Sequence, residues 1–184
     1  MWYGESFKLK IYYLFMLADG RCSAEENDKF DSICRAMKVD DKNKQEVIDY
    51  CNKVMMVFSD DNSTIITVEI SKLLSSGNPF SKSEEAEILW NLINLAYSDG
   101  EYSEPEKIVV AFLVNCWAID ATTFSDFIDT AETMLALEKE KQWLKKAGRD
   151  FDITVAKIHG IDDTISRLAQ NVNLLISEAD LEVK

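Results

Sequence analysis

The sequence predicts an all-α protein of about eight helices, in which two similar three-helix units are related by an internal repeat and a long C-terminal helix follows. Three observations lead to this fold class. Apolar residues recur at helical spacing along most of the 184 residues. The chain contains only six Gly and two Pro, too few for a β fold with many turns. Signals for helix starts and helix ends alternate along the chain.

The first unit opens with a helix expected over about residues 2–18. Its apolar positions follow helical spacing, at Phe7, Ile11, Leu14, Phe15 and Ala18. Asp19 and Gly20 end this helix, because Gly readily adopts the left-handed conformation that often follows one. Ser23 and Glu26 then form a capping box, in which each side chain accepts a backbone N–H of the other residue. A second helix is therefore expected to run to about residue 37.

Two more helices and a loop complete the first half of the chain. Asp40 or Asp41 caps a third helix over about 42–58, and a fourth helix is expected over about 63–75. Residues 75–81 contain Gly and Pro and form a loop.

The same pattern then returns in the second half. A helix over about 83–98 ends at Asp99 and Gly100, and the next, over about 104–117, starts with the spacing Ser103 and Glu106. Pro105 suits the first turn of that helix, where a missing N–H costs little. The last two helices are expected over about 122–146 and 150–182.

The repeat has a constant offset of 80 residues without a gap. It aligns Asp19 with Asp99, Gly20 with Gly100, Ser23 with Ser103 and Glu26 with Glu106. A single helical hairpin cannot bury its apolar face, so we expect the two units to share one core. We therefore divide the chain into a repeat domain, residues 1–137, and a C-terminal helical extension, residues 138–184.

Two segments carry a family resemblance: Leu14-Phe-Met-Leu-Ala-Asp-Gly-Arg-Cys-Ser-Ala-Glu-Glu26 and Leu95-Ala-Tyr-Ser-Asp-Gly-Glu-Tyr-Ser-Glu-Pro-Glu106. Each is an apolar helix, then Asp-Gly, then a capped helix that opens with Glu. This pattern resembles the TerB-like family, named for tellurite resistance, and is also similar to the N-terminal domain of a membrane-anchored DnaJ-type co-chaperone. The resemblance covers roughly residues 7–137. It implies an all-α fold with acidic residues at the turns and a link to metal or stress response in bacteria, with no established reaction.

The formal charge of −13 is concentrated in the repeat domain. Residues 1–137 hold 12 Lys or Arg and 24 Asp or Glu, whereas residues 138–184 hold eight and nine. Such a surface repels phosphate backbones and anionic lipids, so neither nucleic acid nor a membrane surface is expected as a partner. Cations or a basic protein surface are the complementary partners.

The acidic turns are the predicted binding site. Asp19, Glu26, Asp99 and Glu106 could bring carboxylates together around a hard divalent cation such as Ca²⁺, Mg²⁺ or Mn²⁺. The alternative interpretation is structural: Glu26 and Glu106 serve as capping residues, and Asp favours turns through local hydrogen bonds. Neither turn has the Asp-x-Asp-x-Asp-Gly pattern of an EF-hand.

No catalytic constellation is evident, and we expect the protein not to be an enzyme. The single histidine, His159, has no partner pattern around it. Cys22 precedes a helix start, but the acidic residues beside it disfavour a thiolate. The four cysteines follow no disulfide or metal-site spacing, which favours reduced thiols and a cytoplasmic location. No secretion signal and no transmembrane segment are expected.

The C-terminal helix carries a heptad-like seam, defined by Ile158, Ile161, Ile165, Leu168, Val172 and Leu175. One interpretation packs this helix on the repeat domain. The other lets it project and pair with a partner or a second copy of the chain, which gives a homodimer through the seam. Gly160 weakens a helix interior and could break the helix so that its distal half folds back.

Overall fold

The computed structural model describes residues 2–56, 61–75, 80–100, 102–147 and 151–180, and every regular element in these ranges is an α-helix. The all-α prediction is confirmed. The chain forms two compact structural units, Met1–Ile119 and Asp120–Lys184, which are called the first and the second unit from here on. Residues 57–58, 150 and 181–182, which were predicted to be helical, and residues 76–79 of the predicted loop lie outside the described ranges. None of the described helices combines the length and the apolar character needed to span a membrane.

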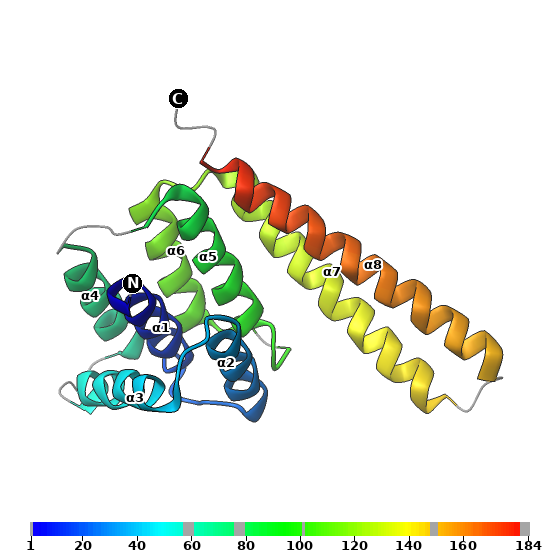
Figure 1. Cartoon of the computed structure of the whole chain (residues 1–184), viewed down its shortest axis with the longest axis horizontal. Helices are drawn as coiled ribbons and strands as arrows, with labels where there is room; N and C mark the ends of the chain where they lie inside the picture. Colours follow the sequence, from blue (N-terminus) through cyan, green and yellow to red (C-terminus); the bar gives the residue numbers. More distant parts are fainter. Residues whose placement is uncertain (1, 57–60, 76–79, 101, 148–150, 181–184) are drawn as a thin grey trace. The chain divides into compact units, whose positions relative to one another are not determined.

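The described part of the first unit contains six helices, of which five surround the central helix α1 (Figure 1). They are α1 (Trp2–Met16), α2 (Ala24–Ala36), α3 (Asp41–Met56), α4 (Asn62–Ser75), α5 (Lys82–Ala96) and α6 (Glu104–Trp117). Helix α1 contacts each of the other helices of this unit. All predicted helices are present, with ends that differ from the expectation by a few residues.

The central position of α1 explains its composition. The five residues predicted to face inward are buried, but so are Leu9, Tyr12 and Met16 on other sides of the helix. A helix enclosed by neighbours is apolar on most of its surface rather than along one stripe. The hydroxyl group of the buried Tyr12 has a hydrogen-bond partner, because it accepts from Asn91 Nδ2 at 3.1 Å.

Backbone features recur at the offset of 80 residues. Gly20 and Gly100 have positive φ values of 77° and 90°. The non-glycine residues Lys38 and Ala118 also share a left-handed conformation, with φ of 56° and 51°. The start of α3 is capped by Asp40, whose Oδ1 accepts the N–H of Asn43 at 2.8 Å, and Asp120 does the same for Thr123. The two halves of the chain thus use the same turn geometry at matched positions.

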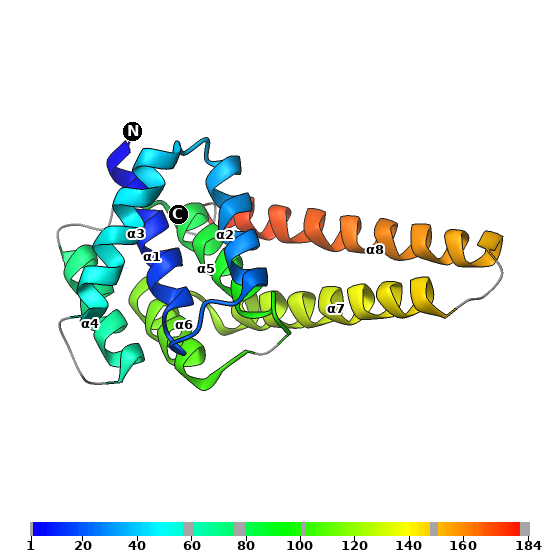
Figure 2. The same ribbon diagram turned by 90° about the horizontal axis from the view of Figure 1, so that it is seen from below.

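The second unit is an antiparallel hairpin of α7 (Ala121–Lys146) and α8 (Phe151–Glu178), which lie side by side in both views (Figures 1 and 2). Helix α8 continues through Gly160, so the predicted alternative of a break there is not realised. Two seam residues, Ile161 and Val172, are buried, and the others are half-buried. The ion pair of Lys141 Nζ with Asp162 Oδ1, at 2.5 Å, joins the two helices. The seam therefore has a partner in its own chain, α7.

Candidate functional site at the acidic turns

The first acidic turn follows α1 and is held by its own aspartate. Asp19 Oδ1 accepts the backbone N–H of Arg21 at 2.8 Å, and the N–H of Gly20 donates to the carbonyl of Leu17. A short polar side chain that bonds the backbone two residues further on stabilises a turn locally. The second turn places Asp99 before Gly100, whose N–H donates to the carbonyl of Tyr97 in the same way.

Both predicted capping boxes are present. Glu26 Oε2 accepts the N–H of Ser23 at 2.7 Å, and Ser23 Oγ accepts the N–H of Glu26 at 3.0 Å. In the second repeat Glu106 Oε2 accepts the N–H of Ser103 at 2.8 Å, while the return bond to Ser103 Oγ is longer, 3.5 Å. Both glutamates are buried, with exposed fractions of 5% and 4%. The two capping carboxylates of the repeats therefore lie in the protein interior.

The charges of the two turns act on each other. Burial raises the pKa of Glu106 to about 7; hydrogen bonds from Ser103 oppose this shift, and the negative charges of Glu26 and Asp19 add to it. Burial also raises the pKa of Glu26, again opposed by Ser23, with further contributions from Asp19 and Asp99. The fold thus brings residues of both repeats into one acidic cluster, which we define as Asp19, Glu26, Asp99 and Glu106.

The acidic cluster is not a preformed coordination shell. Within the described ranges, no group of three or more His, Cys, Asp or Glu side chains is placed so that it could hold a metal ion. One oxygen of Glu26 and one of Glu106 already accept a serine N–H. In this conformation the cluster is a region of negative potential rather than a set of converging ligands.

Two further side chains border the acidic cluster. Burial, together with the charges of Glu26 and Asp19, raises the pKa of Cys22 to about 11, which keeps this thiol protonated at neutral pH as the sequence predicted. Burial and the charge of Glu106 also raise the pKa of Tyr102. Its ring packs against that of Tyr97, with centroids 5.4 Å apart. Tyr102 was not among the predicted site residues; the signal for it in the sequence is its position directly before the capping Ser103.

Comparison with known proteins agrees with this architecture. The family model described as tellurite resistance protein TerB matches residues 11–129, which include both acidic turns. No curated protein and no solved structure matches the chain significantly, and the expected similarity to the DnaJ-type co-chaperone domain is not shown. Since the family model covers more than half of the chain, this all-α protein with paired acidic turns belongs to the TerB family.

Proposed function

We propose that this protein is a TerB-family binding module whose acidic cluster takes up a divalent cation, Ca²⁺, Mg²⁺ or Mn²⁺, with low affinity. The observation that carries the proposal is the burial of Glu26 and Glu106, which are 5% and 4% exposed, close enough to Asp19 for its charge to raise the pKa of both. A buried carboxylate in a negative field is stabilised by any nearby positive charge. Carboxylate oxygens are also the ligands that hard divalent cations prefer.

Cation binding would act on both repeats together. Asp19 and Glu26 flank the turn between α1 and α2, and Asp99 and Glu106 flank the turn between α5 and α6. Since no three described carboxylates are grouped to hold an ion, the side chains must rearrange to form a coordination shell. Part of the binding free energy is spent on that movement, which favours weak binding. We assign the module no reaction of its own, and we infer that it contributes to metal or stress response through protein contacts in the cytoplasm.

Two observations support the cytoplasmic assignment and the choice of partner. All four cysteines are free thiols, two of them exposed, which is usual for a reducing compartment. The charge of −13 favours a basic surface on any protein partner.

Isothermal titration calorimetry with Ca²⁺, Mg²⁺, Mn²⁺ and Zn²⁺ tests the proposal. We expect heat of binding for the parent and its loss in Asp19→Asn/Asp99→Asn. The matched control is Asp163→Asn/Glu178→Gln, which removes two exposed charges from the second unit and should bind as the parent does. Absent binding in the parent, or equal binding in all three proteins, would leave the acidic residues as caps and solubilising charge.

The second candidate function is a protein-interaction scaffold that acts through the C-terminal hairpin. Large apolar side chains are exposed there: Trp143 is 54% exposed, Phe151 77% and Leu174 59%. A surface groove of the same hairpin is lined by Leu168 and Leu175 together with polar residues of α7. Exposed apolar area of this kind is commonly covered by a partner.

Homodimerisation through Leu168 and Leu175, the half-buried seam residues that line this groove, is the specific form of this second candidate. Light scattering would give 21.0 kDa for a monomer and twice that mass for a dimer. If the hairpin is the interface, Leu168→Asp/Leu175→Asp should convert a dimer into a folded monomer. A parent that is monomeric at all concentrations would exclude self-association, and a dimer indifferent to the substitutions would place the interface elsewhere.

A further inference from the structure

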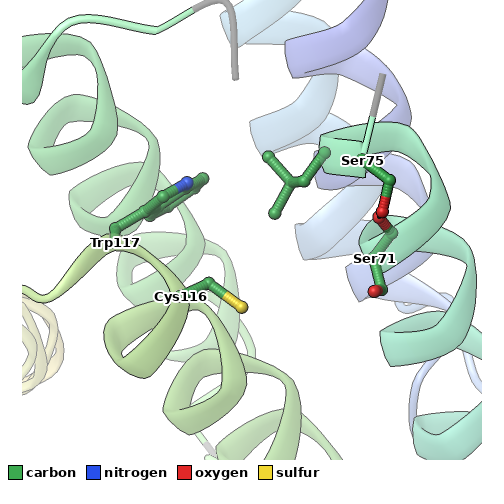
Figure 3. Close-up of a pocket in the computed structure, with 5 residues that line it drawn as sticks. Ser71, Ser75, Cys116 and Trp117 are labelled. Carbon is green, nitrogen blue, oxygen red and sulfur yellow. The ribbon is translucent and has the colours of Figure 1, made fainter. Parts of the chain in front are cut away.

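A pocket of about 300 Å³ lies between the C-terminal turns of α4 and α6, away from the acidic cluster. Figure 3 shows its labelled walls: Ser71 and Ser75 on α4, and Cys116 and Trp117 on α6. Leu74 is the remaining lining residue. A second hollow of about 310 Å³ shares Ser71 and Ser75 and extends along the same two helices to Phe112. The volume is at the lower end of the range of small-molecule sites.

One polar atom of this pocket lacks a partner. Trp117 is 2% exposed, and its Nε1 has no hydrogen-bond acceptor in the described part of the chain. Figure 3 shows the ring extending from α6 towards α4, with the nitrogen in the part of the ring away from the backbone. A buried N–H that has lost water without gaining an acceptor is costly, and a ligand oxygen that accepts from it recovers this cost.

The Trp117 ring is held firmly in place. Its edge-to-face contact with Phe80 has a centroid distance of 6.3 Å and an interplanar angle of 88°. The Trp117 carbonyl accepts a hydrogen bond from Lys82 Nζ at 2.6 Å, and the same Nζ pairs with Glu85 at 2.7 Å. A donor fixed in this way is preorganised, so a ligand spends little free energy on ordering it.

The chemistry of the walls restricts the ligand. None of the described lining residues of the pocket is charged, and Lys72 lines the adjoining hollow. The C-terminal ends of two helices and the charge of −13 both disfavour an anion there. Leu74 and the indole ring provide apolar contacts, and Trp117 Nε1 requires an acceptor because an indole nitrogen only donates.

We propose that the α4–α6 pocket binds a small neutral molecule with an apolar body and a carbonyl oxygen that accepts a hydrogen bond from Trp117 Nε1. This nitrogen is closed to water in the structure, so the oxygen reaches it after a rearrangement of the side chains that line the pocket. This site is independent of cation uptake at the acidic turns.

The test compares two ligands of the same shape, acetophenone and α-methylstyrene, of which only the first has a carbonyl oxygen. In ¹H–¹⁵N spectra of the full chain, Trp117→Phe identifies the indole resonance of Trp117 among the four tryptophans. We expect acetophenone to shift this resonance downfield in a saturable titration. α-Methylstyrene should bind about tenfold more weakly, because it leaves the N–H without an acceptor.

Matched variants locate the binding. Ser71→Phe fills the pocket from an exposed helix position and should abolish the shift, whereas Ser166→Phe, an exposed serine of α8, should leave it unchanged. Leu74→Ala should strengthen acetophenone binding, because it removes a lining side chain and enlarges the pocket. The proposal is overturned if acetophenone leaves the Trp117 indole unmoved, if the two ligands bind equally, or if Ser71→Phe still binds. If Trp117→Phe does not fold, the Trp117 resonance is assigned by elimination with Trp2→Phe, Trp90→Phe and Trp143→Phe, so that the outcomes remain readable.

Discussion

Asp19 and Glu106 belong to different repeats, yet the charge of Asp19 contributes to the raised pKa of Glu106. At the offset of 80 residues, Asp99 corresponds to Asp19 and Glu26 corresponds to Glu106. The charge of Asp99 likewise contributes to the raised pKa of Glu26. The internal repeat therefore produces a reciprocal pair of contacts between the turns. The four carboxylates occupy turn and capping positions in the sequence, and in the fold their charges act on one another.

The first prediction concerns the pH dependence of stability. The pKa of Glu106 is raised to about 7 in the folded state, so its ionisation destabilises the fold as pH rises from its unfolded value, about 4.3, towards 7 and beyond. Glu106→Gln keeps the capping acceptor but has no charge. We expect Glu106→Gln to gain about 1–3 kcal/mol of unfolding free energy relative to the parent between pH 4 and pH 8.

Urea unfolding of both proteins across this pH range measures the effect. Glu104→Gln, an exposed glutamate of the same helix turn, is the control and should show no comparable trend. A stability difference between Glu106→Gln and the parent that does not vary with pH would mean that Glu106 titrates normally.

The second prediction concerns the two helix caps. Loss of a serine cap usually costs about 0.5–2 kcal/mol, so Ser23→Ala and Ser103→Ala should each destabilise the first unit. The bond to Ser23 Oγ is 3.0 Å and that to Ser103 Oγ is 3.5 Å, and we therefore expect the larger loss for Ser23→Ala. Thermal and urea melts compare the variants with Ser166→Ala, which alters an exposed serine inside a helix. Unchanged melts for Ser23→Ala and Ser103→Ala would contradict the energetic role of the caps.

The third prediction concerns a polar contact between α3 and α4. The Tyr50 hydroxyl donates to Glu69 Oε1 at 2.5 Å, and Lys72 Nζ lies 3.1 Å from the other carboxylate oxygen. Burial tends to raise the pKa of Glu69, but these two bonds outweigh it and lower the pKa. Tyr50→Phe should cost about 1.5–3 kcal/mol at neutral pH, the usual range for a hydrogen bond to a charged group.

The pH dependence of this loss has a defined sign. A depressed carboxyl pKa stabilises the fold above the unfolded value and loses that contribution as pH falls through the folded value. The difference between Tyr50→Phe and the parent should therefore shrink in acid. A double-mutant cycle with Glu69→Gln isolates the pair; a coupling energy near zero would show that the contact adds nothing to stability.

The fourth prediction concerns the C-terminal hairpin. Val172 is 1% exposed and lies on the α8 face that meets α7. A carboxylate at that position would be desolvated without a partner, so Val172→Asp should unfold α7 and α8. Hydrogen exchange should show lost amide protection in the second unit and retained protection in α1–α6. Asn173→Asp places the same charge on the neighbouring exposed residue and should be neutral; protection retained in Val172→Asp would contradict the observed packing of α8.

Apart from the capping box of Ser81 and Glu84, which was not predicted, the sequence alone determined the helices, their caps and the repeat. These are local properties: the spacing of apolar residues, Ser followed three residues later by Glu, and Gly after Asp all act within one or two helical turns. For this reason the predicted ends of the helices differ from the structure by only a few residues, and the family resemblance carried by the same motifs was confirmed.

Only the tertiary structure decided which surfaces meet. The seam of α8 is equally compatible with an intermolecular and an intramolecular contact, because periodicity shows that a face is apolar and not what covers it. In the structure α8 packs against α7 of the same chain. The same holds for the buried N–H of Trp117 and for the coupling of Asp19 with Glu106. Burial and through-space charge depend on residues far apart in the chain, and no local pattern encodes their distance.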